Sequence, residues 1–185
     1  QAKLQGPLDT LLLYLNSAYA KDDGVISDNY INGGADFEKY YLKRHSIYAR
    51  TKLEHDRIRG YDFSATAALG YGCYFIKKAD HTLRVRTGFL YRYNAFIDDR
   101  KESNAGIDFG LSHMYQINNH LKLLNEVVYT PSVENYLDYR ICHESSLVIP
   151  LLNSGMWKLQ LGVTNDYNSM PVEDKDYLDT SYFTR

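Results

Sequence analysis

The sequence predicts an all-β protein, an antiparallel up-and-down transmembrane β-barrel of about ten strands, with twelve strands as the alternative count. Three observations predict it: apolar and polar side chains alternate with a period of two, the predicted strands are long, and longer connections alternate with tight ones. A strand turns successive side chains to opposite faces, so each predicted strand has one apolar and one polar face. The length of 185 residues suits a single domain over residues 1–185.

The predicted strands follow one another along the whole chain. In chain order they cover residues 8–19, 29–42, 46–57, 62–76, 81–96, 103–116, 121–131, 136–150, 156–168 and 175–185. Most exceed the roughly 5–6 residues of ordinary strands and fit a tilted span across lipid. The longer connections (AKDDGVISD, RIRGY, IDDRKE, PSVEN and NSMPVEDKD) alternate with tight ones (KRH, KKAD, INNH and LNSG), a pattern typical of outer-membrane barrels.

Local patterns support individual strands. The first contains the longest apolar run, residues 11–15, which is too short for the roughly 20 residues of a membrane-spanning helix. The fourth carries Gly70 and Gly72 on its polar face, where they leave room for the long side chains of Arg84 and Arg86 on the next strand. The alternation is clearest in 81–96, 103–116 and 156–168. It is weakest in 121–131, where apolar and charged side chains share a face.

The orientation of the two faces decides the interpretation. In a membrane barrel the apolar face contacts lipid and the polar face surrounds the lumen, whereas a soluble sheet buries its apolar face. The predicted lumen charge network comprises Arg50, Lys52, Glu54, Asp56, Arg84, Arg86, Arg92, Asp138, Arg140, Glu144 and Lys158. The predicted lipid-facing residues are Leu83, Val85, Phe89, Tyr91, Trp157, Leu159, Leu161 and Val163. An aromatic girdle at the headgroup level is predicted from Tyr19, Tyr41, Tyr61, Phe96, Tyr115 and Tyr136.

Composition narrows the function classes. Eighteen Tyr and seven Phe against four Pro favour strands. A net charge of −2 does not indicate the strongly positive surface that nucleic-acid-binding proteins carry. The chain starts at Gln1, so we expect a mature form whose signal peptide has been removed, located in the bacterial outer membrane. The expected partners are outer-membrane lipid, lipopolysaccharide and a small solute or ion. Cys73 and Cys142 fall on opposite faces of their strands, so no disulfide is expected between them.

The sequence contains only weakly supported candidates for a catalytic or metal-binding site. Ser112 and His113, with Glu126 on the next strand, resemble a hydrolase triad, but adjacent residues of a strand point to opposite faces. Glu54, His55 and Asp56, with Asp98 and Asp99 in a longer loop, are better explained as solvated rim charges. The turn histidines His45, His81 and His120 lack the ligand spacing of a zinc site. We therefore expect no enzymatic activity, no cofactor and no metal.

The segments IYARTKLEHDRIRGYDFSATAALGYGCYFI, LRVRTGFLYRY and LQLGVTNDYNSMPVEDKDYLDTSYF resemble the YdiY-like family. The recognisable features are Gly70-Tyr71-Gly72 and a tail containing Tyr167 and Pro171. Members are described as salt-induced outer-membrane proteins and otherwise classed as a domain of unknown function. The resemblance covers residues 47–182 and implies a Gram-negative outer-membrane barrel, without assigned chemistry, linked to salt or osmotic response.

Ten strands would enclose a narrow lumen, because side chains just fill the interior of a barrel of about eight strands and open pores appear near sixteen strands. The sequence therefore predicts a structural role or a small-solute or ion pore with a closed or very narrow lumen. The alternative is a soluble lipocalin-like barrel that binds an apolar ligand. In that alternative the faces are exchanged: Leu83, Val85, Phe89 and Leu159 line the cavity, and Arg84, Arg86 and Lys158 contact water.

Overall fold

The computed structural model describes residues 2–22, 25–56, 61–151, 158–171 and 176–185. The side chains of residues 3, 18–22, 25–29, 56 and 61 also lie outside the described set. The described residues form one antiparallel sheet of eleven strands in chain order, so every strand pairs with its neighbours in the sequence. No helix in this part of the chain is long and apolar enough to cross a membrane.

The strands differ mainly in length. They are β1 (Ala2–Gln5), β2 (Asp9–Asp22), β3 (Val25–Tyr40), β4 (His45–Asp56), β5 (Tyr61–Lys77), β6 (His81–Phe96), β7 (Lys101–Asn118), β8 (Leu121–Pro131), β9 (Tyr139–Pro150), β10 (Lys158–Asn168) and β11 (Leu178–Thr184). The prediction of an all-β antiparallel up-and-down architecture is confirmed, because the ten predicted strands correspond to β2 through β11. The additional strand β1 was missed, since four residues are too few to show a period.

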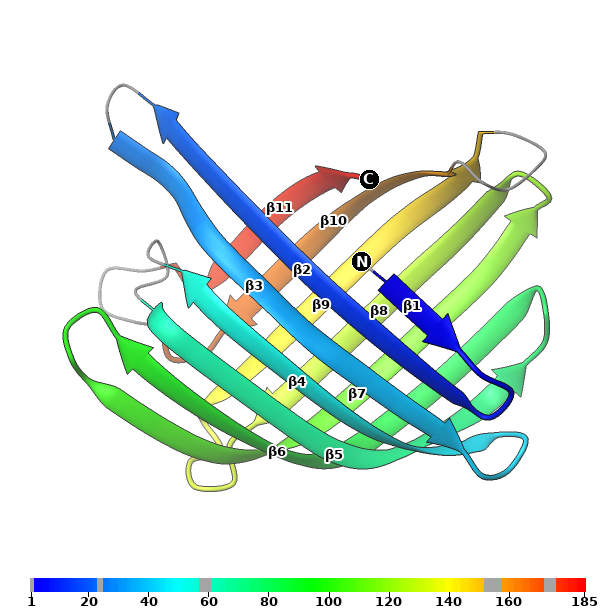
Figure 1. Cartoon of the computed structure of the whole chain (residues 1–185), viewed down its shortest axis with the longest axis horizontal. Helices are drawn as coiled ribbons and strands as arrows, with labels where there is room; N and C mark the ends of the chain where they lie inside the picture. The colour runs from blue at the N-terminus through cyan, green and yellow to red at the C-terminus, as the bar shows by residue number, and fades with distance from the viewer. Residues whose placement is uncertain (1, 23–24, 57–60, 152–157, 172–175) are drawn as a thin grey trace.

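The sheet curls strongly, so that β2 and β3 cross in front of β9 and β10 in Figure 1. It therefore has a concave and a convex face. Its edge strands are β1 and β11, and no backbone pairing joins these two edges among the described residues. The architecture is that of a curled half-barrel.

The predicted alternation of loop lengths is wrong in the first half of the sheet. The segment AKDDGVISD was expected as a long loop, but β2 and β3 extend into it and leave only residues 23–24 between them. The pairs Lys21↔Ile26 and Asp22↔Val25 continue the ladder beyond a bulge, so backbone hydrogen bonding overrides the polar composition of this segment. Longer connections do occur at this rim after β8 and β10, at residues 132–138 and 169–177. Residues 151–157 separate β9 from β10, and the tight turn predicted there, LNSG, lies outside the described residues.

The strand predicted to begin at 136 begins at Tyr139 instead. The Ser132 hydroxyl accepts hydrogen bonds from the backbone N–H groups of Glu134 and Asn135, each at 3.2 Å. A Ser side chain bonded in this way stabilises a turn and competes with strand pairing. Tyr136 consequently lies in a loop, where 79% of its surface is exposed.

Candidate functional site on the concave face

The sheet carries its polar side chains on the concave face and its apolar side chains on the convex face. The buried polar residues Ser46, Glu54, Ser64, Arg86, Asp108, Ser132 and Ser146 outnumber the buried apolar ones, which are Tyr48, Ala68, Leu90 and Phe96. In contrast, Phe89, Leu15, Leu69 and Phe75 are 81%, 72%, 64% and 62% exposed. This distribution is the reverse of an ordinary soluble sheet, in which large apolar side chains are buried.

A central cluster on this face consists of Tyr48, Arg50, Arg86, Asp108 and Glu126. Asp108 is 1% exposed and accepts a hydrogen bond from the Tyr48 hydroxyl at 2.7 Å. The Arg86 Nε donates to the same carboxylate at 3.2 Å, and its Nη1 donates to Glu126 at 2.9 Å. Arg50 on β4 reaches Asp108 on β7 at 3.8 Å, a contact between strands that are not neighbours. The central cluster therefore spans the hollow of the sheet.

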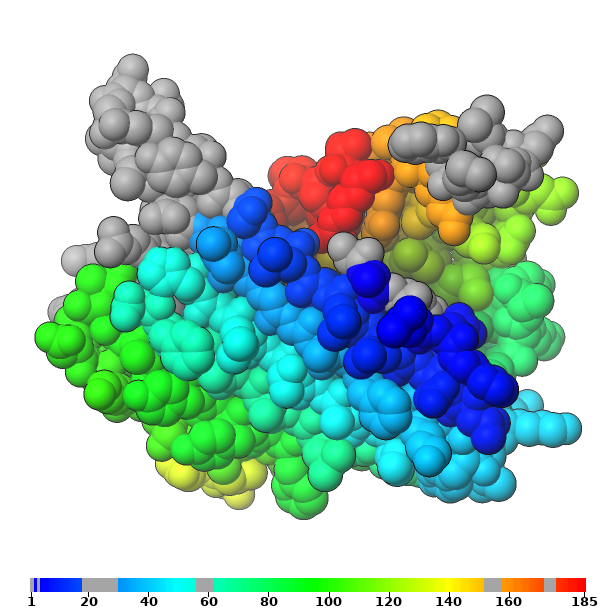
Figure 2. Space-filling view, viewed as in Figure 1, coloured from blue at the N-terminus to red at the C-terminus, as the bar shows by residue number. Residues whose placement is uncertain are grey.

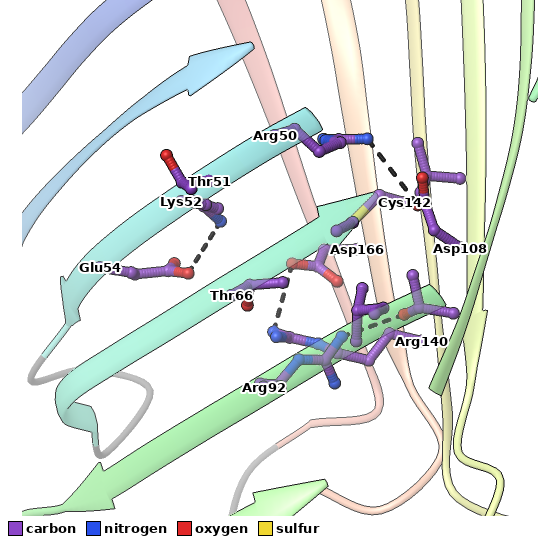
Figure 3. A pocket seen from close by; sticks show the side chains of 14 residues that line it. Arg50, Thr51, Lys52, Glu54, Thr66, Arg92, Asp108, Arg140, Cys142 and Asp166 are labelled. Atoms are coloured by element: carbon purple, nitrogen blue, oxygen red, sulfur yellow. Dashed lines mark hydrogen bonds and ion pairs between the residues drawn. The ribbon is translucent and has the colours of Figure 1, made fainter. Parts of the chain in front are cut away.

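Further polar groups lie on both sides of the central cluster. Toward the tight turns, Arg84 contacts Glu38 at 2.6 Å, and Ser46 donates to the same carboxylate. Toward the longer loops, Lys52 pairs with Glu54 at 2.8 Å and Arg140 approaches Asp166 to 3.7 Å. Figure 3 shows the group toward the longer loops: Lys52 and Glu54 on β4, Arg92 on β6, Arg140 on β9 and Asp166 on β10. Both signs of charge are paired, as buried ions require.

The central cluster lies between two of the cavities of the sheet, and a third, of about 220 Å³, adjoins Ser112, Glu126 and Glu144. The larger, of about 820 Å³, lies toward the tight turns and is lined by Tyr14, Glu38, Arg84, Arg86 and Glu144 among others. The smaller, of about 100 Å³, lies toward the longer loops and is lined by Lys52, Arg92, Arg140, Cys142 and Asp166 among others. Arg50 borders both cavities. Charged side chains from β4, β6, β7 and β8 therefore lie between these two cavities.

Glycines make room for two of the arginines. A Cβ at Gly110 would lie 2.6 Å from the Arg86 Cζ, and one at Gly72 would lie 2.8 Å from the Arg84 Nη2. The expectation that glycine accommodates these arginines therefore holds for Gly72 but not for Gly70, which packs against Gly88 and Tyr48. Arg86 instead lies over Gly110 on β7, its partner in the ladder.

We expect Gly110→Ala to lower the free energy of unfolding by about 1–3 kcal/mol, a typical cost of overpacking a tight site. Arg86 has little freedom to move aside, because it is 7% exposed and bonded to Asp108 and Glu126. Urea unfolding followed by circular dichroism measures the loss. The matched control is Gly33→Ala, whose new Cβ would lie 3.2 Å from the exposed Leu15 side chain and 3.2 Å from the Tyr14 backbone oxygen, milder contacts than the 2.6 Å at Gly110. Equal losses in both variants would contradict the close fit of Arg86 over Gly110.

The predicted lumen residues occupy several environments. Arg50, Lys52, Glu54, Arg84, Arg86, Arg92, Arg140 and Glu144 line the two cavities. Lys158 is exposed at the start of β10, and Asp138 lies in the loop before β9, where it accepts a hydrogen bond from Asn104 at 2.7 Å. The side chain of Asp56 lies outside the described residues. Six further charged residues belong to the network but were not predicted: Asp36, Glu38, Asp108, Glu126, Asp166 and Arg185. Their strand parity could have identified them.

The predicted lipid-facing residues that the structure describes share the convex face. Phe89, Tyr91 and Leu161 are exposed, and Leu83, Val85, Leu159 and Val163 are partly exposed. They pair across the ladder with other convex residues, as Phe89 does with Leu69 and Ile107. Trp157 lies outside the described residues.

The predicted girdle residues are scattered. Tyr41 and Tyr115 are exposed near the tight turns, whereas Phe96 is only 7% exposed. The Arg100 guanidinium lies over the Phe96 ring, with its Cζ 4.6 Å from the ring centre. The side chains of Tyr19 and Tyr61 lie outside the described set. A continuous aromatic row was missed. It crosses β7 to β10 and ends at Tyr177, directly before β11. The row comprises Phe109, Tyr129, Tyr139, Tyr167 and Tyr177, with ring centres 5.8–6.4 Å apart.

One part of the convex face departs from the apolar pattern. Ser145 donates to Asn125 at 2.7 Å, and Thr180 donates to Asn165 at 2.9 Å. The Asn165 amide also lies 3.3 Å from the His143 Nδ1. These side chains hydrogen-bond with one another across β8 to β11, so each has a partner without water.

The candidate catalytic and metal-ligating residues whose side chains the structure describes lie apart from one another or on opposite faces of the sheet, with the exceptions of His81 with His113 and of Ser112 with Glu126. Ser112 lines the cavity on the concave face, while His113 contacts His81, with their Nε2 atoms 3.2 Å apart. His45 contacts the Tyr71 hydroxyl and His55 contacts the Asp62 carbonyl. Among the described residues no group of three His, Cys, Asp or Glu side chains could hold a metal ion. Cys73 and Cys142 are both free thiols.

Comparison with protein families gives one match over nearly the whole chain. Residues 6–185 match the family described as protein of unknown function, DUF481. The comparisons with curated proteins and with solved structures found no match.

Proposed function

The chain belongs to the DUF481 family of proteins of unknown function, and we propose that it is an outer-membrane β-barrel with a narrow charged lumen. Its role is structural, or it allows restricted passage of small solutes or ions. The observation that carries the proposal is the inverted distribution of side chains. Arg86 and Asp108 are buried in the hollow of the sheet, whereas Phe89 on the same strand as Arg86 is 81% exposed.

The convex face supports contact with lipid. An exposed apolar surface of this extent is rare on a soluble monomer, where the largest apolar patch is roughly 300–600 Å². Here exposed apolar side chains occur on nearly every strand, including Leu15, Ile31, Leu53, Leu69, Phe89, Leu111 and Leu161. The row of tyrosines near the longer loops suits the headgroup level, since a phenol is apolar at its body and polar at its tip. The partners in this proposal are outer-membrane lipid and lipopolysaccharide.

The concave face supports a closed or nearly closed lumen. The two cavities are separated by the central cluster, and Arg50 contacts Asp36 at 3.6 Å and Asp108 at 3.8 Å across this boundary. A lipocalin-like protein requires an apolar cavity for its ligand, and the charged lining of both cavities favours the membrane barrel over that alternative. The link to salt or osmotic response, implied by the resemblance to YdiY-like proteins, belongs to this proposal.

Membrane insertion is tested by refolding the full chain into vesicles of phospholipid and lipopolysaccharide. We expect it to float with the vesicles, to resist extraction with carbonate, and to migrate faster on a gel unboiled than boiled. A folded chain that stays in the aqueous phase and migrates at the same position with and without boiling would contradict the proposal.

We expect Arg50→Ser to raise ion conductance in planar bilayers from near zero to a measurable level. The substitution removes the side chain that borders both cavities, and Arg86 keeps its partners Asp108 and Glu126. The matched control is Arg100→Ser, which removes an exposed charge between β6 and β7. A large conductance in the unmodified protein, or no increase in a well-inserted Arg50→Ser variant, would contradict a lumen closed at the central cluster.

A further inference from the structure

Two strand edges lie open in the described sheet. The outer edge of β2 pairs with β1 only from Thr10 to Leu13, and no strand lies beside it from Tyr14 onward. β11 is the opposite edge strand. In the hydrocarbon core, backbone groups without partners cost several kcal/mol each, so spanning sheets must close. The inference below therefore rests on the proposed membrane location.

We propose that β11 and β1 together form the tenth strand of a closed barrel, with both of them paired to β2. The strands alternate in direction along the sheet, so β11 runs parallel to β1 and antiparallel to β2. A closing contact between β11 and β1 side by side would be parallel and would give eleven strands. Bacterial outer-membrane barrels have an even number of antiparallel strands. Placing β11 and β1 end to end along β2 meets both requirements.

The closing register follows from the pairing across the sheet. A line perpendicular to the strands starts at Asp9 in β2 and reaches Leu178 in β11. It passes through Lys39, Ile47, Tyr71, Thr87, Phe109, Tyr129, Ile141 and Tyr167. In a closed barrel this line returns to β2 at a residue further along the strand than Asp9, and we call the displacement in residues the offset. For ten strands about 4.8 Å apart with a rise of about 3.3 Å per residue, a strand tilt of about 35–45° requires an offset of about 10–14 residues.

The position of β1 selects one offset in this range. The offset must be even, because an odd one would turn the β11 side chains to the wrong face. An offset of about 10 residues would place Thr184 beside Leu13, which already pairs with Ala2. An offset of about 12 residues places Thr184, the last residue of β11, beside Leu15, whereas β1 pairs with β2 only from Thr10 to Leu13. This is the smallest even offset in the range at which β11 and β1 do not compete for the same residues of β2.

The cavity toward the tight turns supports this arrangement. It is lined by Tyr14 and Asn16 of β2 together with Arg185, so the closing segments already border one space. In Figure 2 the blue surface of β1 and β2 faces the red surface of β11 across a hollow. The faces also agree, because Tyr14 and Arg185 line the cavity while Leu15 and Thr184 are exposed.

Disulfide trapping tests the register in the full chain with Cys73 and Cys142 replaced by serine. We expect Leu15→Cys with Thr184→Cys to form an intramolecular disulfide in vesicles under mild oxidation, since cross-strand neighbours lie within the 4.4–6.8 Å Cα distance that a disulfide needs. The matched control is Leu15→Cys with Leu178→Cys, which the proposed register places about 20 Å apart along the strand. It should not cross-link.

Three outcomes overturn the proposed closure: cross-linking of Leu13→Cys with Thr184→Cys instead, disulfides that join two chains, or no cross-link in a chain inserted in vesicles. These outcomes leave the membrane proposal intact, because insertion is measured separately by flotation. Conversely, the expected cross-link in a chain that remains in the aqueous phase supports closure and rejects the outer-membrane location.

Discussion

Replacing Asp108 with alanine is expected to lower the free energy of unfolding by about 3–5 kcal/mol, the range for breaking a buried ion pair by removing one partner. Asp108 is 1% exposed and contacts three residues of the central cluster. It accepts from the Tyr48 hydroxyl at 2.7 Å and from the Arg86 Nε at 3.2 Å, and it lies 3.8 Å from the Arg50 Nη1.

The size of the effect follows from what the substitution leaves behind. Arg86 remains buried and keeps only the Glu126 carboxylate of its two ionic partners. The Tyr48 hydroxyl loses its acceptor in a site that is 4% exposed. A buried donor without a partner costs about 1–3 kcal/mol, in addition to the unbalanced charge. Asp108→Asn keeps the volume and an acceptor oxygen, so it should cost less than Asp108→Ala.

Equilibrium unfolding by urea in vesicles, followed by circular dichroism, measures both variants. Asp98→Ala serves as the matched control, because it removes an exposed carboxylate that pairs with Arg100 at 3.6 Å. Exposed ion pairs contribute about 0–1 kcal/mol, so this control should unfold near the unmodified midpoint. If Asp108→Ala unfolds at the same midpoint as Asp98→Ala, the central cluster does not hold the walls of the sheet together.

The order of the ten longer strands and the face of their side chains were predictable because both depend on local alternation. The bounds of β6 and β8 agree with the sequence pattern, and Arg84 and Arg86 share the cavity-lining face that parity assigns them. Ionic partners were not predictable, because they depend on strand register. Arg86 and Glu126 are far apart in sequence and meet only after β6, β7 and β8 pair.

Two features of the sheet required information beyond a single strand. β1 is too short to show a period, and its pairing with β2 depends on the turn between them. The aromatic row was missed because its members lie at different distances from their own strand ends. Tyr129 and Tyr139, for example, become neighbours only when β8 pairs with β9. The register between strands therefore decides which residues form a band across the sheet. The alternation of side chains within one strand does not reveal that register.

We expect Phe89→Arg to destabilise the folded chain in vesicles by about 2–4 kcal/mol, the cost of a cationic side chain near the bilayer midplane. Phe89 lies near the middle of β6, is 81% exposed, and has Leu69 and Ile107 as its neighbours on the adjacent strands. A guanidinium at this position has no carboxylate on the convex face within its immediate ladder neighbours. Folding would therefore move the charge into hydrocarbon.

The matched control is Leu83→Arg on the same strand and the same face, close to the tight turn that precedes β6. Near the interface an arginine costs about 0–1 kcal/mol, because its long side chain can reach the headgroups. Urea unfolding in vesicles should therefore separate Phe89→Arg from Leu83→Arg. If the convex face contacts water instead, both arginines are hydrated and both variants should unfold near the unmodified midpoint. The depth dependence of the loss thus distinguishes a lipid-facing surface from a solvated one, which stability measurements on the concave face cannot do.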